Sequence, residues 1–149
     1  ENGNLKLIST KPLRFEIYET EALKQWPEYK AAAVNKAAIY GIYRTFLHTK
    51  ENELELTAGL RELHSASPYL VKQNPQYKVT VKTTREQALK AITTVLPKVK
   101  TYQDLVTKQT ISGMVFEDVW TDEFSRVYLK GSEQAKLLKA LNAKTSYGK

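Results

Sequence analysis

The stretch from Pro27 to Thr49 constrains the fold of this chain more than any other. Its apolar residues recur every third or fourth position, which predicts one buried face of a helix. Lys30, Arg44 and His48 fall on the opposite side. At about 1.5 Å per residue, some twenty residues make a rod of about 30 Å, whereas a chain of this length has a radius of gyration of only about 15 Å. The helix must therefore cross most of the domain, and its buried stripe comprises Ala31, Val34, Ala38, Ile39, Ile42, Tyr43 and Phe46.

Length and composition place the chain among globular proteins. Its 149 residues suffice for one domain, and 42% are hydrophobic and 26% charged. No run approaches the ~18 uninterrupted apolar residues of a membrane span, because Asn35, Lys36 and Arg44 interrupt the central helix. The chain contains no cysteine, which excludes disulfides, thiolate metal sites and cysteine nucleophiles.

The first residues, Glu-Asn-Gly-Asn, are polar and do not begin with Met. Removal of a signal peptide leaves such a terminus. This favours an extracytoplasmic protein, periplasmic or secreted, with a cytoplasmic protein as the alternative.

Alternation of apolar and polar residues predicts the strands. Residues 13–19 and 76–83 alternate cleanly, and residues 4–9 have the pattern of a short edge strand. Residues 111–120 are apolar on both faces, which is typical of a central strand covered on both sides. A polar turn at 121–125 would then return the chain through a strand at 126–130. The sequence thus predicts a hairpin over 111–130 at the centre of the sheet.

Helices are predicted from periodicity and capping residues. Thr83 and Glu86 have the spacing of a capping box for a helix over 84–96, and Ser132 begins another through residue 141. Residues 51–64 fit a helix best, although 53–57 also alternate as a strand would. The remaining segments are predicted as a helical turn over 20–26, a loop over 65–75, a short helix over 101–108 and a polar, flexible tail over 142–149.

These elements predict an α+β fold in a single domain over residues 1–141. A four- or five-stranded, largely antiparallel sheet would be covered by the long central helix and two or three shorter helices. Many unrelated functions share such an architecture, so the fold by itself assigns no activity.

The sequence contains no motif for catalysis, metal binding or a cofactor. His48 and His64 have no neighbours at metal-ligand spacing, and the six glycines are scattered singly. No Gly-x-Ser-x-Gly elbow is present. Acidic clusters near residues 16–21 and 117–123 are typical of solvated surface. No catalytic residue, metal site or cofactor is predicted, and a small enzyme without a recognisable motif is the third functional alternative.

The positive charge is concentrated in one quarter of the chain. Residues 72–108 contain eight Lys and Arg against two acidic residues, which accounts for six of the seven net charges. Lys78 and Lys82 share the exposed face of a strand, and Arg85 and Lys90 follow on the next helix. Aromatic residues in or beside the segment, among them Tyr77, could stack on bases or sugars.

These features predict a non-enzymatic interaction module within a larger assembly. The module would dock an acidic protein or an anionic surface through Lys78, Lys82, Arg85, Lys90 and Tyr77. A nucleic-acid-associated protein using the same segment is the alternative. The chain has eighteen lysines and five arginines, and because arginine is favoured for bidentate phosphate recognition, this ratio disfavours specific nucleic-acid binding. A solvated face that merely aids solubility explains the same charge without a partner.

Overall fold

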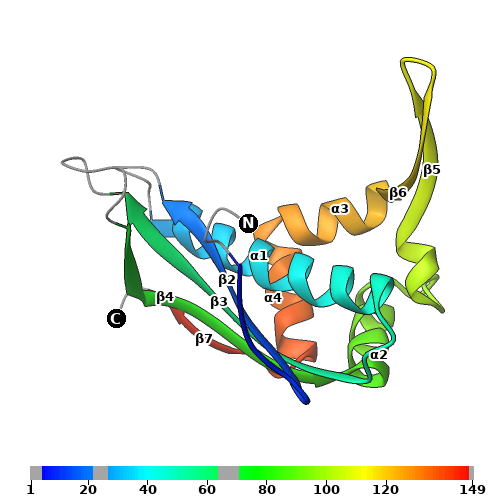
Figure 1. Ribbon diagram of the computed structural model, residues 1–149. Helices are drawn as coiled ribbons and strands as arrows, with labels where there is room; N and C mark the ends of the chain where they lie inside the picture. Colours follow the sequence, from blue (N-terminus) through cyan, green and yellow to red (C-terminus); the bar gives the residue numbers. More distant parts are fainter. Residues whose placement is uncertain (1–4, 22–26, 64–70, 148–149) are drawn as a thin grey trace.

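The computed structural model describes residues 5–21, 27–63 and 71–147. A five-stranded sheet forms one layer of the molecule, and the helices form a second layer on one of its faces (Figure 1). Only the pair β2–β3 is parallel, and the other neighbours are antiparallel. In the order in which they lie in the sheet, the strands are β1 (Leu5–Thr10), β2 (Leu13–Glu21), β3 (Glu53–Leu63), β4 (Val71–Thr84) and β7 (Lys144–Tyr147).

The long helix α1 (Pro27–His48) connects the two parallel strands β2 and β3 and packs on the inner face of the sheet. Ile42, Tyr43 and Phe46 are fully buried there, which confirms the predicted central helix. Gly41 allows close approach, because a Cβ atom at this position would lie 2.5 Å from Ile17 Cδ1. The close packing of α1 on the sheet therefore requires a residue without a side chain at position 41.

Three shorter α-helices complete the helical layer. An aromatic cluster joins α1 to α3 (Asp122–Leu129), with the rings of Tyr43 and Phe124 5.5 Å apart and those of Trp120 and Phe124 4.7 Å apart. None of the helices in the described ranges combines the length and apolarity needed to cross a membrane. The shorter helices are α2 (Arg85–Val95), the 3₁₀ helix η1 (Tyr102–Leu105), α3 (Asp122–Leu129) and α4 (Gly131–Ala140).

The predicted helix over residues 51–64 is wrong, because this segment is the central strand β3. Leu54, Leu56, Ala58 and Leu60 are all buried. Leu54 and Ala58 are four residues apart, a spacing that fits both one face of a helix and every second residue of a strand. The strand prevails because β3 pairs with β2 on one side and β4 on the other.

The predicted central hairpin over 111–130 is also wrong. The chain forms a separate two-stranded hairpin, β5 (Val106–Ile111) and β6 (Met114–Trp120), followed by α3 in place of the second strand. Thr121 Oγ1 accepts a hydrogen bond from the Phe124 N–H at 3.2 Å and caps α3. Apolarity on both faces of 111–120 therefore marks an exposed hairpin rather than a strand buried on both sides.

Smaller corrections concern the ends of elements. Residues 71–75, predicted as loop, belong to β4, and the capping box lies one residue later, between Thr84 and Gln87. Within the predicted flexible tail, residues 144–147 form β7, whose Tyr147 hydroxyl donates to Asn35 Oδ1 on α1. Residues 20 and 21 lie in β2, and the rest of the predicted turn over 20–26 falls outside the described residues.

Hydrogen exchange should separate β3 from the projecting hairpin. Leu56 lies in β3, which is paired on both sides, so its amide should exchange only with an opening free energy near that of global unfolding. Val115 in the hairpin is 62% exposed, and its amide should exchange at least about a hundredfold faster. Native-state exchange followed by NMR measures both rates, and equal protection at the two positions would contradict this assignment.

Candidate functional site

Two strands place lysines side by side on the outer face of the sheet, which no helix of the described residues covers (Figure 1). Lys78 and Lys82 are exposed on β4, on either side of Thr80. The register partner of Thr80 on β7 is Lys144. Diagonal neighbours on antiparallel strands lie about 7–8 Å apart, so the backbone of Lys144 is within reach of both other lysines.

A fourth lysine approaches from the helical side. Lys90 on α2 lines a hollow of about 450 Å³ together with Lys82 and Asn142. The hollow therefore joins the end of β4 to the exposed side of α2. We call Lys78, Lys82, Lys90 and Lys144 the lysine cluster.

No acidic side chain of the described residues forms an ion pair with the lysine cluster. Glu55 lies opposite Lys82 on β3, but its carboxylate is 3.5 Å from Arg14 Nε. Glu16, on the same face of the sheet, accepts a hydrogen bond from the Tyr18 hydroxyl. Like charges on neighbouring strands repel one another. Among the described residues, the ammonium groups of the lysine cluster are therefore not neutralised by an ion pair.

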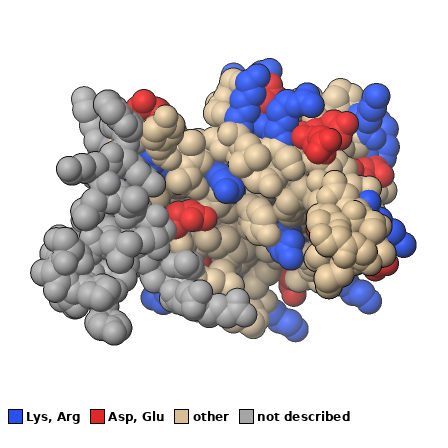
Figure 2. Space-filling model, turned by 90° about the horizontal axis from the view of Figure 1, so that it is seen from above, with Lys and Arg blue, Asp and Glu red and all other residues tan. Residues whose placement is uncertain are grey.

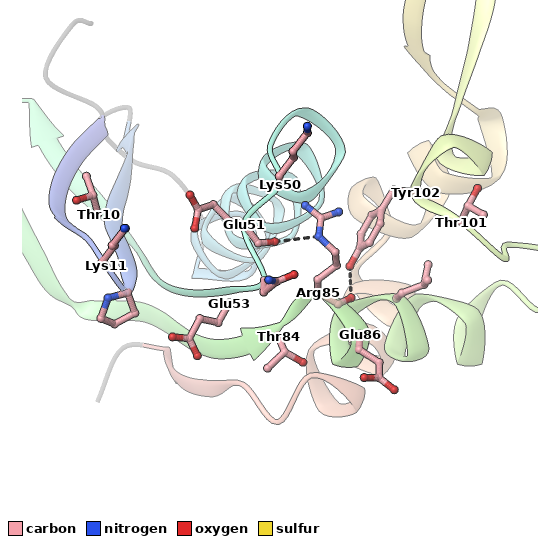
Figure 3. A pocket seen from close by; sticks show the side chains of 13 residues that line it. Thr10, Lys11, Lys50, Glu51, Glu53, Thr84, Arg85, Glu86, Thr101 and Tyr102 are labelled. Atoms are coloured by element: carbon pink, nitrogen blue, oxygen red, sulfur yellow. Dashed lines mark hydrogen bonds between the residues drawn. The ribbon is translucent and has the colours of Figure 1, made fainter.

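The guanidinium of Arg85, which the sequence predicts as a docking residue, makes its hydrogen bonds within the molecule. Nε donates to the Glu51 carbonyl at 2.9 Å, Nη1 to the Phe46 carbonyl at 2.7 Å, and Nη2 to the Thr49 carbonyl. The guanidinium also lies over the rings of Phe46 and Tyr102. Arg85 thus holds the end of α1 and the start of α2 together (Figure 3). We call this arrangement the arginine clamp.

Tyr77 does not join the lysines either. Its side chain is 6% exposed and faces α1, where Lys30 Nζ lies 5.5 Å from the ring centroid. Strand alternation already separates residue 77 from residues 78 and 82. Sequence reasoning missed Lys144, because the polar segment 142–149 was predicted to be unstructured. The alternation of Lys144 and Ser146 with Thr145 and Tyr147 is the sequence pattern that indicates a strand there.

A pocket of about 840 Å³ lies beside the arginine clamp (Figure 3). Its charges are mixed, since the lining contains Lys11, Lys50 and Arg85 as well as Glu51, Glu53 and Glu86. The lining has no histidine to act as a base near neutral pH. The pocket therefore lacks the uniform charge of the lysine cluster.

The tyrosine at the pocket is a structural donor rather than a base. The Tyr102 hydroxyl donates to the Arg85 carbonyl at 2.5 Å. Burial, the dominant effect, raises the pKa of Tyr102 well above its usual range. The hydroxyl therefore stays protonated and serves the clamp.

The histidine and the carboxylates of the described residues do not form a metal site. In the described ranges no three His, Asp or Glu side chains are grouped as metal ligands. His48 Nε2 lies 4.0 Å from Asp118 Oδ2, at the base of the hairpin, and His64 falls outside the described residues. Comparison of the chain with protein-family models, with curated proteins and with solved structures gives no significant match. Function must therefore be argued from the geometry of this chain.

Proposed function

We propose that this protein is a non-enzymatic interaction module of a larger assembly that docks an acidic protein through the lysine cluster. One observation carries the proposal. Lys78, Lys82 and Lys144 are held side by side on a sheet face that no described helix covers, without an acidic ion-pair partner among the described residues. Such a surface attracts carboxylates, and its potential accelerates encounter with an acidic partner.

Two features favour a protein over a nucleic acid as the partner. The cluster consists of lysines, which act as point charges, whereas bidentate recognition of phosphate favours arginine. Single-stranded nucleic acids are usually held on exposed aromatic rings, but Tyr77 and Tyr18 are both buried. The part of the outer face formed by described residues therefore offers charge without exposed aromatic rings. An anionic envelope and a nucleic acid remain as distinct outcomes of the test.

The cellular setting is part of the proposal. We place the module outside the cytoplasm, in the periplasm or secreted. A chain without cysteine is compatible with that setting, as it is with the cytoplasm. Fractionation of cells that express the full gene product tests this placement, and recovery of the protein with the cytoplasmic fraction would contradict it.

Charge reversal at the lysine cluster should remove most binding to polyanions. A variant carrying Lys78→Glu, Lys82→Glu and Lys144→Glu should fold normally, because all three side chains are exposed. Its retention on a polyanionic column should fall to near that of a neutral protein. Retention of the parent protein should weaken steeply with salt, since the Debye length falls from about 10 Å at 0.1 M to about 3 Å at 1 M. Circular dichroism checks the fold of each variant.

The matched control reverses three exposed lysines elsewhere, Lys36→Glu, Lys50→Glu and Lys98→Glu, and changes the net charge equally. It should keep most of the retention, because the cluster is intact. Equal loss in both variants would show that retention follows net charge, and solubility would then explain the lysines. Binding to duplex DNA with a logarithmic salt slope of about −3.6, as expected for four neutralised phosphates, would favour the nucleic-acid alternative.

A further inference from the structure

The hairpin β5–β6 projects from the body as a narrow arm (Figure 1). Its turn is tight, with φ of 51° at Ser112 and 81° at Gly113. Trp120 at its base packs on Phe124, whereas residues 107–118 are all exposed. A two-stranded hairpin alone is at best marginally stable in water. We call residues 106–120 the arm.

The two faces of the arm differ in chemistry. Register pairs Ile111 with Met114 and Gln109 with Phe116, which places these four side chains on one face. That face bears no charge, and Met114 and Phe116 are 63% and 43% exposed. On the other face, Lys108 Nζ lies 3.4 Å from Glu117 Oε1, and Val115, the register partner of Thr110, is the exposed apolar residue of that face. The arm is therefore amphipathic, and its apolar face is uncovered in the single chain.

A second uncovered apolar surface lies on the edge strand β1. Leu5 and Leu7 are the register partners of Ile17 and Phe15, and so lie on the helix-covered side of the sheet. They are nevertheless 56% and 58% exposed, and Ile8 is 48% exposed. The outer edge of β1 has no partner strand among the described residues. We call Leu5, Leu7 and Ile8 the ledge.

The charges around the two surfaces are opposite. Residues 109–123 contain four acidic side chains and no Lys or Arg, whereas residues 2–15 contain three basic side chains and no Asp or Glu. Complementary charges around apolar patches guide association and fix its orientation. Two of these charges are already paired within the chain, Glu117 with Lys108 and Arg14 with Glu55, and Glu16 is the register partner of Lys6. The acidic group without a Lys or Arg partner among the described residues is Asp118, Asp122 and Glu123, and the basic group near the ledge is Lys6 and Lys11.

From these two surfaces we infer that the protein associates with itself head to tail, the arm of one copy packing on the ledge of the next. The arm extends away from the sheet that carries the ledge (Figure 1), so the contact forms between copies. Figure 2, seen from the side toward which the arm points, shows a lobe without charged atoms at the end opposite the grey residues. One contact of this kind buries both apolar surfaces.

Contacts with other copies through the arm and the ledge would cover most of the large apolar side chains that are exposed in the single chain. Six of the ten large apolar side chains exposed among the described residues belong to the apolar face of the arm or to the ledge. Two patches of so few side chains, even with a polar rim, belong to the small end of specific interfaces, which lies at about 1,200 Å². Association should therefore be in the micromolar range. Because the two surfaces differ, the contact is heterologous and builds a ring or an open chain. This inference does not depend on the lysine cluster.

Sedimentation of the intact protein and two double variants tests the inference. The arm variant carries Met114→Glu and Phe116→Glu, and the ledge variant carries Leu5→Glu and Leu7→Glu. The mass of the unmodified protein should rise with concentration beyond that of a dimer, while each variant alone should stay monomeric. An equimolar mixture of the two variants should form dimers and nothing larger, because it retains one arm and one ledge that fit. The control Tyr29→Glu, Leu129→Glu alters exposed apolar residues elsewhere and should associate normally.

Three outcomes would overturn the inference. The first is an unmodified protein that remains monomeric at several hundred micromolar. The second is a ledge variant that associates as well as the unmodified protein, which would indicate contacts between arms. The third is a mixture of folded arm and ledge variants that contains only monomers, with circular dichroism confirming the fold of each. If the unmodified monomer floats with lipid vesicles, the arm is a membrane contact instead.

Discussion

Replacing Phe46 with alanine should lower the free energy of unfolding by about 4 kcal/mol. Phe46 is 1% exposed, in the stripe that α1 presents to the core. Its ring also lies beneath the Arg85 guanidinium and beside the Tyr102 ring, at 5.7 Å between centroids. The substitution therefore removes buried apolar area and leaves a cavity under the arginine clamp. Chemical denaturation followed by circular dichroism measures the change.

Ile42 and Tyr29 provide the comparison on the same helix. Ile42 is fully buried, so Ile42→Ala should cost about 3 kcal/mol. Tyr29 is 61% exposed near the start of α1, and Tyr29→Ala should change stability by no more than about 0.5 kcal/mol. If Phe46→Ala and Ile42→Ala were as mild as Tyr29→Ala, α1 would not be the core of this fold.

Loss of the arginine clamp should be nearly as damaging. Arg85→Ala removes three charge-assisted hydrogen bonds to the carbonyls of Phe46, Thr49 and Glu51. Carbonyls at the end of a helix have no partner within the helix, so α1 would lose its C-terminal cap. Because Arg85 is only partly buried, we expect a loss of about 3 kcal/mol rather than the full sum of three bonds.

Two further substitutions separate the geometry of the clamp from its charge. Arg85→Lys keeps the charge, but an ammonium group cannot reproduce the planar fork, so about half of the loss should remain. Arg14→Ala removes an exposed ion pair with Glu55 and should change stability by less than about 1 kcal/mol. Similar results for Arg85→Ala and Arg14→Ala in denaturation experiments would show that the clamp contributes no more than a surface charge.

Elements with one dominant period could be predicted from the sequence. α1 and α4 follow from helical spacing, and β2 follows from strict alternation. Prediction failed at β3, where Leu54 and Ala58 satisfy two periods at once. It also failed over 111–130, because an exposed hairpin and a buried strand have the same apolar composition. Only pairing and packing with distant elements decide such cases.

Only part of the candidate site could be predicted from the sequence. Alternation places Lys78 and Lys82 on one face of β4, but local patterns do not show which strand lies beside them. Lys144 lies beside them only because β7 pairs with β4, although three α-helices separate the two strands in the sequence. Arg85 had the charge of a docking residue, and only the position of the α1 C-terminus shows that its guanidinium is occupied.

The strand order has a consequence for the growing chain on the ribosome. β4 is complete at Thr84, but its neighbour β7 begins only at Lys144. Throughout synthesis of the stretch between them, the β4 edge that β7 later covers is an open template for other strands. Exposed Lys78 and Lys82 on that same strand give neighbouring nascent chains a like charge, and like charges oppose their pairing. These two lysines would thus oppose pairing between the unfinished sheets of neighbouring chains.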